Sequence, residues 1–188
     1  MSGGVISGNS AQASGVHGLG GGVKVDKGGT FTMNDGEISG NFAKGDGGGI
    51  YLEGTFTMKG GAISGNITGP SPEGATGGGV LVASATFIME GGVISGNTAV
   101  DENGGGVGMY NGDSTFIMIG GTIYGSADRL PAGVDASLAN NAPSGVALFS
   151  RGTARWGTGG TYTKGGVAQA GGSDIGRTND TLIAIPAR

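Results

Sequence analysis

The segment Gly60-Gly61-Ala62-Ile63-Ser64-Gly65-Asn66 is one copy of a pattern that recurs along the chain. Close copies are Gly3–Asn9, Asp35–Asn41 and Gly91–Asn97, and Gly120–Ser126 is a worn copy that keeps only Gly-Gly-Thr-Ile and one later Gly. Recurrence within 188 residues indicates a repeat architecture, in which each unit buries its apolar side chains by stacking on its neighbours.

Two further signatures alternate with this pattern. Gly-Gly-Gly followed by an apolar stretch occurs at Gly20–Val25, Gly47–Leu52, Gly77–Val82 and Gly104–Met109, and Thr-Phe-x-Met occurs at Thr30–Met33, Thr55–Met58, Thr86–Met89 and Thr115–Met118. We interpret Ser144–Leu148 and Thr161–Thr163 as degraded fifth copies of the two signatures. Apolar residues alternate with polar ones in each signature, which predicts short strands with one buried face.

The spacing of the signatures predicts the fold. The Phe residues of Thr-Phe-x-Met lie 25 to 31 residues apart, which is the length of one turn of a parallel β-helix with three short strands per coil. Stacked coils place equivalent residues about 4.8 Å apart, so Phe, Met, Ile and Val columns would fill the interior. Connecting segments of very different lengths favour the right-handed form. The sequence therefore predicts an all-β, right-handed parallel β-helix (a solenoid) of about five coils.

The corners of the predicted coils carry Gly and Asn. Glycine permits positive φ at a corner and lets a neighbouring chain approach closely. The asparagines of the recurring pattern also fall at a corner, and we expect their stacked amides to hydrogen-bond from coil to coil; they are Asn9, Asn41, Asn66 and Asn97.

The chain changes character after Ser126. All five Arg and the single Trp lie beyond it, and four Lys stand against ten carboxylates before it. Terminal repeats of a solenoid differ from internal ones because they close the stack. We therefore predict one domain, with β-helix repeats in residues 1–126 and a last divergent coil and C-terminal cap in residues 127–188. Trp156 would cover the core at that end.

Composition argues against several classes of function. The net charge of −4 without a basic run argues against nucleic acid as a partner, and no apolar run is long enough for a membrane span. The absence of Cys and the single histidine, His17, exclude a zinc site and leave no nucleophile–base pair with a supporting motif. The Gly-Gly-Gly runs lack the Lys and the helix of a phosphate-binding loop. The sequence therefore predicts no cofactor, no metal and no catalysis.

Tandem Gly-Gly-x-Ile-Ser-Gly-Asn units separated by Gly-Gly-Gly-Val and Thr-Phe-x-Met resemble the glycine-rich β-helical repeats of bacterial surface proteins. These include adhesins and the polymorphic outer-membrane proteins, whose Gly-Gly-Ala-Ile motif is present at Gly60–Ile63. The resemblance implies a pectin-lyase-like β-helix at the bacterial cell surface or outside the cell. Because the chain begins inside a repeat, we interpret it as a fragment or the mature part of an exported protein. That fold hosts lyases, hydrolases and non-catalytic stalks alike.

The candidate binding surface consists of outward threonines and C-terminal aromatic and basic residues. One threonine column is predicted at Thr30, Thr55, Thr86, Thr115 and Thr161, and a second, interrupted by Ile88 and Ile117, at Thr32, Thr57 and Thr163. The others are Arg151, Arg155 and Trp156.

The sequence favours a non-catalytic surface stalk or adhesive binding module, with a cell-surface glycan or protein as partner. It also predicts self-association through the N-terminal coil. Two alternatives remain: a carbohydrate-active β-helix enzyme, which would need paired carboxylates, and an ice-binding protein that uses the threonine columns.

Overall fold

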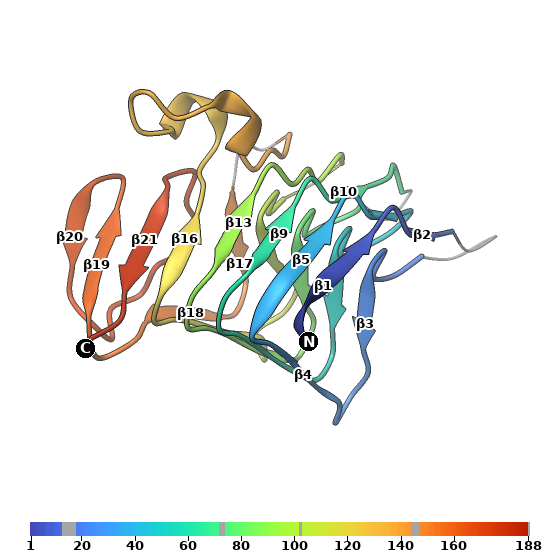
Figure 1. Ribbon diagram of the computed structural model, residues 1–188, viewed down its shortest axis with the longest axis horizontal. Coiled ribbons are helices and arrows are strands. Elements are labelled where there is room, and N and C mark those ends of the chain that lie inside the picture. Colours follow the sequence, from blue (N-terminus) through green and yellow to red (C-terminus); the bar gives the residue numbers. More distant parts are fainter. Residues whose placement is uncertain (13–17, 72–73, 102, 144–146, 188) are drawn as a thin grey trace.

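The structure is a computed structural model that describes residues 1–12, 18–71, 74–101, 103–143 and 147–187. In these ranges the chain winds into stacked coils built from strands, and its helical parts are two short 3-10 turns, η1 (Ala127–Arg129) and η2 (Ala136–Leu138). Successive coils pair in parallel, so that four sheets run along the stack (Figure 1). The predicted all-β parallel β-helix is confirmed.

Three parallel sheets form the walls of the stack. In sheet A the parallel strands are β1 (Ser2–Ser7), β5 (Asp35–Ser39), β9 (Ala62–Ser64), β13 (Val93–Ser95) and β16 (Gly121–Ile123). In sheet C they are β3 (Val23–Val25), β7 (Ile50–Leu52), β11 (Val80–Val82), β14 (Val107–Met109) and β17 (Leu148–Ser150). In sheet D they are β4 (Thr30–Met33), β8 (Thr55–Met58), β12 (Thr86–Met89), β15 (Thr115–Met118) and β18 (Thr153–Trp156).

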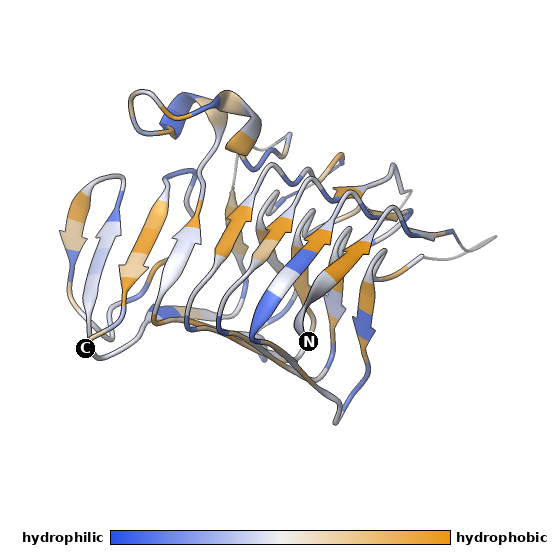
Figure 2. Cartoon of the chain, in the orientation of Figure 1, coloured by the Kyte–Doolittle hydropathy of each residue, from blue (hydrophilic) through white to orange (hydrophobic). Residues whose placement is uncertain are grey.

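The core consists of columns of like side chains, because the register pairs equivalent residues. Phe87 pairs with Phe56 on one side and Phe116 on the other, and its ring centroid lies 4.8 Å and 4.9 Å from theirs. All three rings are fully buried. Figure 2 shows the same repetition in sheet A, where hydrophobic residues recur at one level of successive strands. The predicted burial of Phe56 and Phe87 is confirmed.

A fourth, short sheet occupies the corner that follows the recurring asparagine. Sheet B pairs β2 (Ser10–Ala11), β6 (Phe42–Ala43) and β10 (Ile67–Thr68), and single bridges extend it from Ile67 to Thr98 and on to Asn141. The prediction of three strands per coil was therefore incomplete. The segments after Asn9, Asn41 and Asn66, which the prediction treated as connections, continue the ladder for two residues, and those after Asn97 and Asn140 join it by a single bridge.

The asparagines form a hydrogen-bonded ladder inside this corner. The side-chain amide and backbone N–H of Asn66 donate to Oδ1 of Asn97 over 2.9 Å and 3.0 Å. Asn41 donates to Asn66 in the same way. The predicted coil-to-coil bonding is confirmed, and the ladder has a fifth member that the sequence analysis missed: Asn97 donates to Asn140.

The Gly-Gly-Gly runs lie where this corner is most crowded. A Cβ on Gly48 would approach the carbonyl oxygen of Gly78, in the next coil, and backbone atoms of Ile67, in its own coil, to less than 3 Å. The Gly78 oxygen accepts a hydrogen bond from the N–H of Gly49, and Ile67 lies in β10, so these backbone atoms have little freedom to shift. Glycine is therefore required by the close approach of the chain.

The last coil differs from its prediction. β17 places Leu148 opposite Val107, and β18 places Thr153 opposite Thr115 and Trp156 opposite Met118. Thr153–Trp156 is thus the fifth copy of the Thr-Phe-x-Met strand, and the assignment of Thr161–Thr163 was wrong. The interpretation of Ser144–Leu148 as a fifth copy matched Leu148 with Met109, which was wrong, because Leu148 pairs with Val107. Residues 144–146 lie outside the described residues.

The chain then reverses and closes the C-terminal end. β21 (Leu182–Ile185) pairs antiparallel with β16, β19 (Thr161–Lys164) pairs antiparallel with β21, and β20 (Val167–Gln169) with β19. Antiparallel bridges also reach the other two sheets, from Asp174 to Arg155 and from Thr178 to Leu148. At the C-terminal end, the last parallel strand of each of sheets A, C and D is therefore paired with an antiparallel segment.

Candidate functional site

The outer face of sheet D carries the predicted threonine column. Thr30, Thr55, Thr86 and Thr115 occupy paired positions on adjacent strands, and Thr153 continues the column as its fifth member. Thr161, predicted for that place, lies on β19 in sheet A. The column therefore runs the whole length of sheet D, and its fifth member is Thr153 instead of the predicted Thr161.

The second column begins with threonine and ends with arginine. Thr32 and Thr57 pair, and the next positions are Ile88, Ile117 and Arg155. Arg155 is exposed, and the four others are half-buried. Thr163, like Thr161, lies on β19 and does not belong to this face. The structure thus brings Arg155 onto the same face as the threonines.

Trp156 and Arg151 lie elsewhere. Trp156 is fully buried in the core, with its ring centroid 5.4 Å from that of Tyr162, so its inclusion in a binding surface was wrong. Arg151 is exposed and follows β17 of sheet C, where its guanidinium lies 5.5 Å from the ring centroid of Phe149 and 6.0 Å from that of Tyr110. The predicted surface therefore divides into the face of sheet D and an isolated arginine.

Acidic side chains in the corner loops accept hydrogen bonds from backbone N–H groups of neighbouring segments. Oδ1 of Asp46 accepts a hydrogen bond from the backbone N–H of Thr76 over 2.8 Å, and the carboxylate of Asp101 accepts one from the N–H of Ser71. These bonds fix the chain between β10 and β11. His17 lies outside the described residues, and within them no three His, Cys, Asp or Glu side chains gather closely enough to hold a metal ion.

Tyr51 and Asp128 are among the described groups whose pKa values are displaced by their surroundings. Burial raises the pKa of Tyr51, on the outer side of sheet C, to about 12, and the carboxylates of Glu53 and Asp46 act in the same direction. A hydrogen bond from the hydroxyl of Ser126 lowers the pKa of Asp128, and Arg129 adds to the effect.

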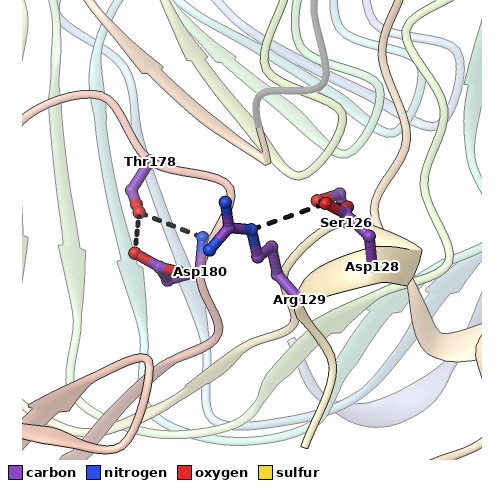
Figure 3. Close-up of polar contacts among 5 residues, drawn as sticks. All are labelled: Ser126, Asp128, Arg129, Thr178 and Asp180. Atoms are coloured by element: carbon purple, nitrogen blue, oxygen red, sulfur yellow. Dashed lines mark hydrogen bonds and ion pairs between the residues drawn. The ribbon is translucent and has the colours of Figure 1, made fainter.

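A basic hollow that the sequence analysis did not predict lies between η1 and the C-terminal strands (Figure 3). Its volume is about 300 Å³, and its lining residues are Arg129, Lys164, Arg177, Thr178, Asn179 and Asp180. Three elements distant in sequence meet here. The only signal in the sequence was the shift towards basic residues after Ser126.

Comparison of the chain with protein-family models, with curated proteins and with solved structures found no match. Within the described ranges, no helix is both long and apolar enough to cross a membrane.

Proposed function

We propose that this chain is a non-catalytic β-helical module of a bacterial surface or extracellular protein, which serves as a rigid stalk and adheres through the outer face of sheet D. The proposal includes the relationship to adhesins and pectin-lyase-like β-helices that the repeats suggest. The observation that carries it is the five-stranded, in-register face with its unbroken threonine column.

This face is uncovered, in contrast to the outer side of sheet C. Leu81 occupies an outward position in sheet C and is only 1% exposed. Thr86 occupies the corresponding central strand of sheet D and remains partly exposed. Short connections, Glu53-Gly54 of two residues and Ala83–Ala85 of three among them, border sheet D and leave its face accessible to a broad partner, a cell-surface glycan or a protein.

The role of the repeated polar residues supports a stalk. Asn41, Asn66 and Asn97 are buried, and their amides bond to one another and to backbone carbonyls. The repeated asparagines thus maintain the stacking of the coils, which is what a rigid spacer requires. The structural role of these asparagines in the stack therefore explains why they recur along the sequence.

A binding screen with paired variants tests the proposal. Thr86→Arg places a long charged side chain in the middle of sheet D, whereas Thr122→Arg makes the same change at a half-buried position next to the inward Ile123 in the middle of sheet A. Arrays of immobilised glycans and surface proteins are probed with the wild-type chain and both variants. We expect a ligand whose binding is lost in Thr86→Arg and kept in Thr122→Arg. Equal binding by both variants would contradict a site on sheet D.

Ice is a second candidate ligand, because Thr30, Thr32, Thr55 and Thr57 form a regular two-by-two array of hydroxyl and methyl groups. Strand spacing repeats this array at about 4.8 Å. Inhibition of ice recrystallisation by the wild-type chain, abolished by Thr55→Arg, would favour ice over an adhesive partner. Full glycan or protein binding without any effect on ice would exclude it.

A further inference from the structure

A second hollow lies on the outer side of sheet C, between two tyrosines. Tyr51 on β7 pairs with Leu81 on β11, and Leu81 pairs with Gly108 on β14, two residues before Tyr110. Backbone hydrogen bonds carry the ladder on to Ala83 and Tyr110. Because Ala83 has only a methyl group, the surface is low at this point, and we call it the tyrosine hollow.

The tyrosine hollow is small and largely apolar. Its volume is about 180 Å³, below the range of about 300–1,000 Å³ for pockets that hold drug-sized ligands. Tyr110 is 50% exposed, so one wall is open to solvent. Among the described residues that line the hollow, Asp46 alone is charged. They are Leu19, Asp46, Tyr51, Gly74, Leu81, Ala83 and Tyr110.

The spacing of the two tyrosines suits a cation between their rings. β7 and β14 flank β11 in sheet C, and adjacent strands lie about 4.8 Å apart, so these two are separated by about 9.6 Å. A cation is attracted to an aromatic ring within about 6 Å of the ring centroid. Burial is the main reason that the pKa of Tyr51 is raised, and Tyr110 contributes to it, so the two phenol groups lie within electrostatic reach of each other.

Two carboxylates give this region the charge that a cation requires. Glu53 and Asp46 both act on the hydroxyl of Tyr51. Oδ1 of Asp46 accepts a hydrogen bond from the backbone N–H of Thr76 over 2.8 Å, which fixes the carboxylate at the hollow. The charge of the hollow is therefore opposite to that of a cationic ligand.

The nearest basic side chains lie outside the hollow. Nζ of Lys24 lies 2.6 Å from Oδ1 of Asp26 and 3.9 Å from Oε2 of Glu53. The guanidinium of Arg151 lies 6.0 Å from the ring centroid of Tyr110. Arg151 follows β17, which is on the opposite side of β14 from β11 and β7. It therefore approaches Tyr110 from the side away from the hollow.

We infer that the tyrosine hollow binds a quaternary ammonium group between Tyr51 and Tyr110, with the carboxylate of Asp46 beside it. Aromatic faces are the recognition surface for such cations. A primary ammonium is strongly hydrated and needs acceptors for three N–H groups, which the side chains of Leu19 and Leu81 do not supply. A trimethylated nitrogen has no N–H and presents methyl groups to these walls.

The test follows the N-methyl protons of choline by nuclear magnetic resonance while the full chain is added. Tyr51→Leu and Tyr110→Leu each remove one ring, and we expect each to weaken binding by about three- to thirtyfold. Tyr51→Phe and Tyr110→Phe keep the ring and should bind within about twofold of the wild type. The matched control is Tyr124→Leu, at a partly exposed tyrosine after β16 in sheet A, which should also stay within about twofold. Circular dichroism and thermal unfolding establish that every variant is folded.

Two close analogues of choline test the charge and the methyl groups. The neutral isostere, in which carbon replaces the nitrogen, should bind far more weakly because it lacks the charge. Ethanolamine, which lacks the methyl groups, should also bind more weakly. Asp46→Asn keeps an acceptor for the N–H of Thr76, and it should weaken choline binding by about two- to fivefold without weakening that of the isostere. Equal binding of either analogue, or unchanged affinity in both leucine variants, would overturn the inference.

Vesicles of phosphatidylcholine distinguish the two sources of the ammonium group. Sedimentation of the chain with these vesicles, lost in Tyr110→Leu, would assign the group to a lipid headgroup, whereas binding of free choline alone would assign it to a soluble ligand. Binding of neither would refute the site. Because the tyrosine hollow is independent of the adhesive face of sheet D, Thr86→Arg should leave choline binding intact, and its loss in that variant would contradict the assignment.

Discussion

At the scale of single residues, the asparagine ladder has a direction. Asn41, Asn66 and Asn97 each donate two hydrogen bonds to the asparagine of the next coil and accept two at Oδ1 from that of the preceding coil. At the C-terminal end Asn140 donates instead to the backbone carbonyls of Tyr124 and Gly125, which ends the series with its donors satisfied. At the other end Asn9 donates to Asn41, and no described residue donates to its Oδ1.

The interior of the ladder should be far more sensitive to mutation than its end. Asn66→Ala removes the acceptor of two buried N–H donors of Asn41 and the donor to the carbonyl oxygen of Ile38, while Oδ1 of Asn97 keeps only its bond from the backbone N–H of residue 66. Since each buried unsatisfied group costs about 1–3 kcal/mol, we expect a loss of at least about 3 kcal/mol in the free energy of unfolding, measured with denaturant. Asn9→Ala, at an exposed position, should cost less than about 1 kcal/mol. Equal losses would mean that the amides contribute no buried bonding.

Tyr51 should make stability fall at high pH. Its pKa is raised from 10.0 to about 12, so the folded state keeps the phenol neutral where an unfolded chain would already have released the proton. The contribution of Tyr51 to stability is therefore complete below about pH 10 and is lost as the pH rises towards 12. Ultraviolet titration of the wild-type chain minus that of Tyr51→Phe isolates this ionisation. Glu53→Gln should lower the midpoint, and a midpoint near 10 would contradict the assignment.

The sequence predicted four of the five ladder residues, and the fifth was missed for a physical reason. Sixteen residues, 124–139, separate Asn140 from the end of β16, and a long surface insertion adds little to the entropic cost of closing the coil. Spacing along the chain therefore could not identify it. A local signal was present: an alanine stands two residues after Asn9, Asn41, Asn97 and Asn140, where the short strands of sheet B and their bridges run.

At the scale of strands, alternation and register were predictable wherever the repeat was intact. The bounds of β4, β8, β12 and β15 coincide with the four Thr-Phe-x-Met segments, because a large aromatic and a long apolar side chain two residues apart fix both the face and the register of a strand. In β18 the same positions hold Ala154 and Trp156. Because β18 has Ala154 where the other strands have Phe, the sequence pattern was not recognised there, and Tyr162 on the antiparallel strand β19 was taken for the equivalent aromatic residue.

The phenylalanine column provides a test of stacking at this scale. Phe87→Ala removes a fully buried ring from between two others, and a truncation of this kind costs about 3–5 kcal/mol in a close-packed core. Phe31→Ala should cost less, since Phe31 is half-buried and stacks on the single ring of Phe56 at 5.3 Å. Denaturant unfolding of both variants gives the comparison. An unchanged stability of Phe87→Ala would contradict the stacked core.

At the scale of the whole molecule, the two ends of the stack differ. Reversed chain covers all three walls at the C-terminal end, which blocks the addition of another parallel coil. At the N-terminal end β1, β3 and β4 are the outermost strands of sheets A, C and D, and the apolar side chains of Met1, Val23 and Phe31 are only partly buried there. The divergent composition of residues 127–188 predicted the cap, but the sequence offered less on how the cap pairs. It could not predict the antiparallel closure, because pairing between β16 and β21 joins segments about 60 residues apart across irregular chain.

This asymmetry leads to the expectation that the chain associates through its N-terminal coil as concentration rises. An outermost strand offers unpaired N–H and C=O groups that can pair with another chain, and sheet A has such strands at both of its edges, β1 and β20. Oδ1 of Asn9, which accepts no hydrogen bond from a described residue, and the partly buried Phe31 favour the β1 end, since they offer an acceptor and an apolar surface in addition to the strand edge. Val5 on β1 and Val167 on β20 are 63% and 65% exposed, so Val5→Lys and Val167→Lys place the same charge at the two edges. Light scattering over a wide concentration range should show that Val5→Lys suppresses association and that Val167→Lys does not. Suppression by Val167→Lys alone would place the contact at the cap, and a wild-type chain that stays monomeric at high concentration would contradict association through either edge.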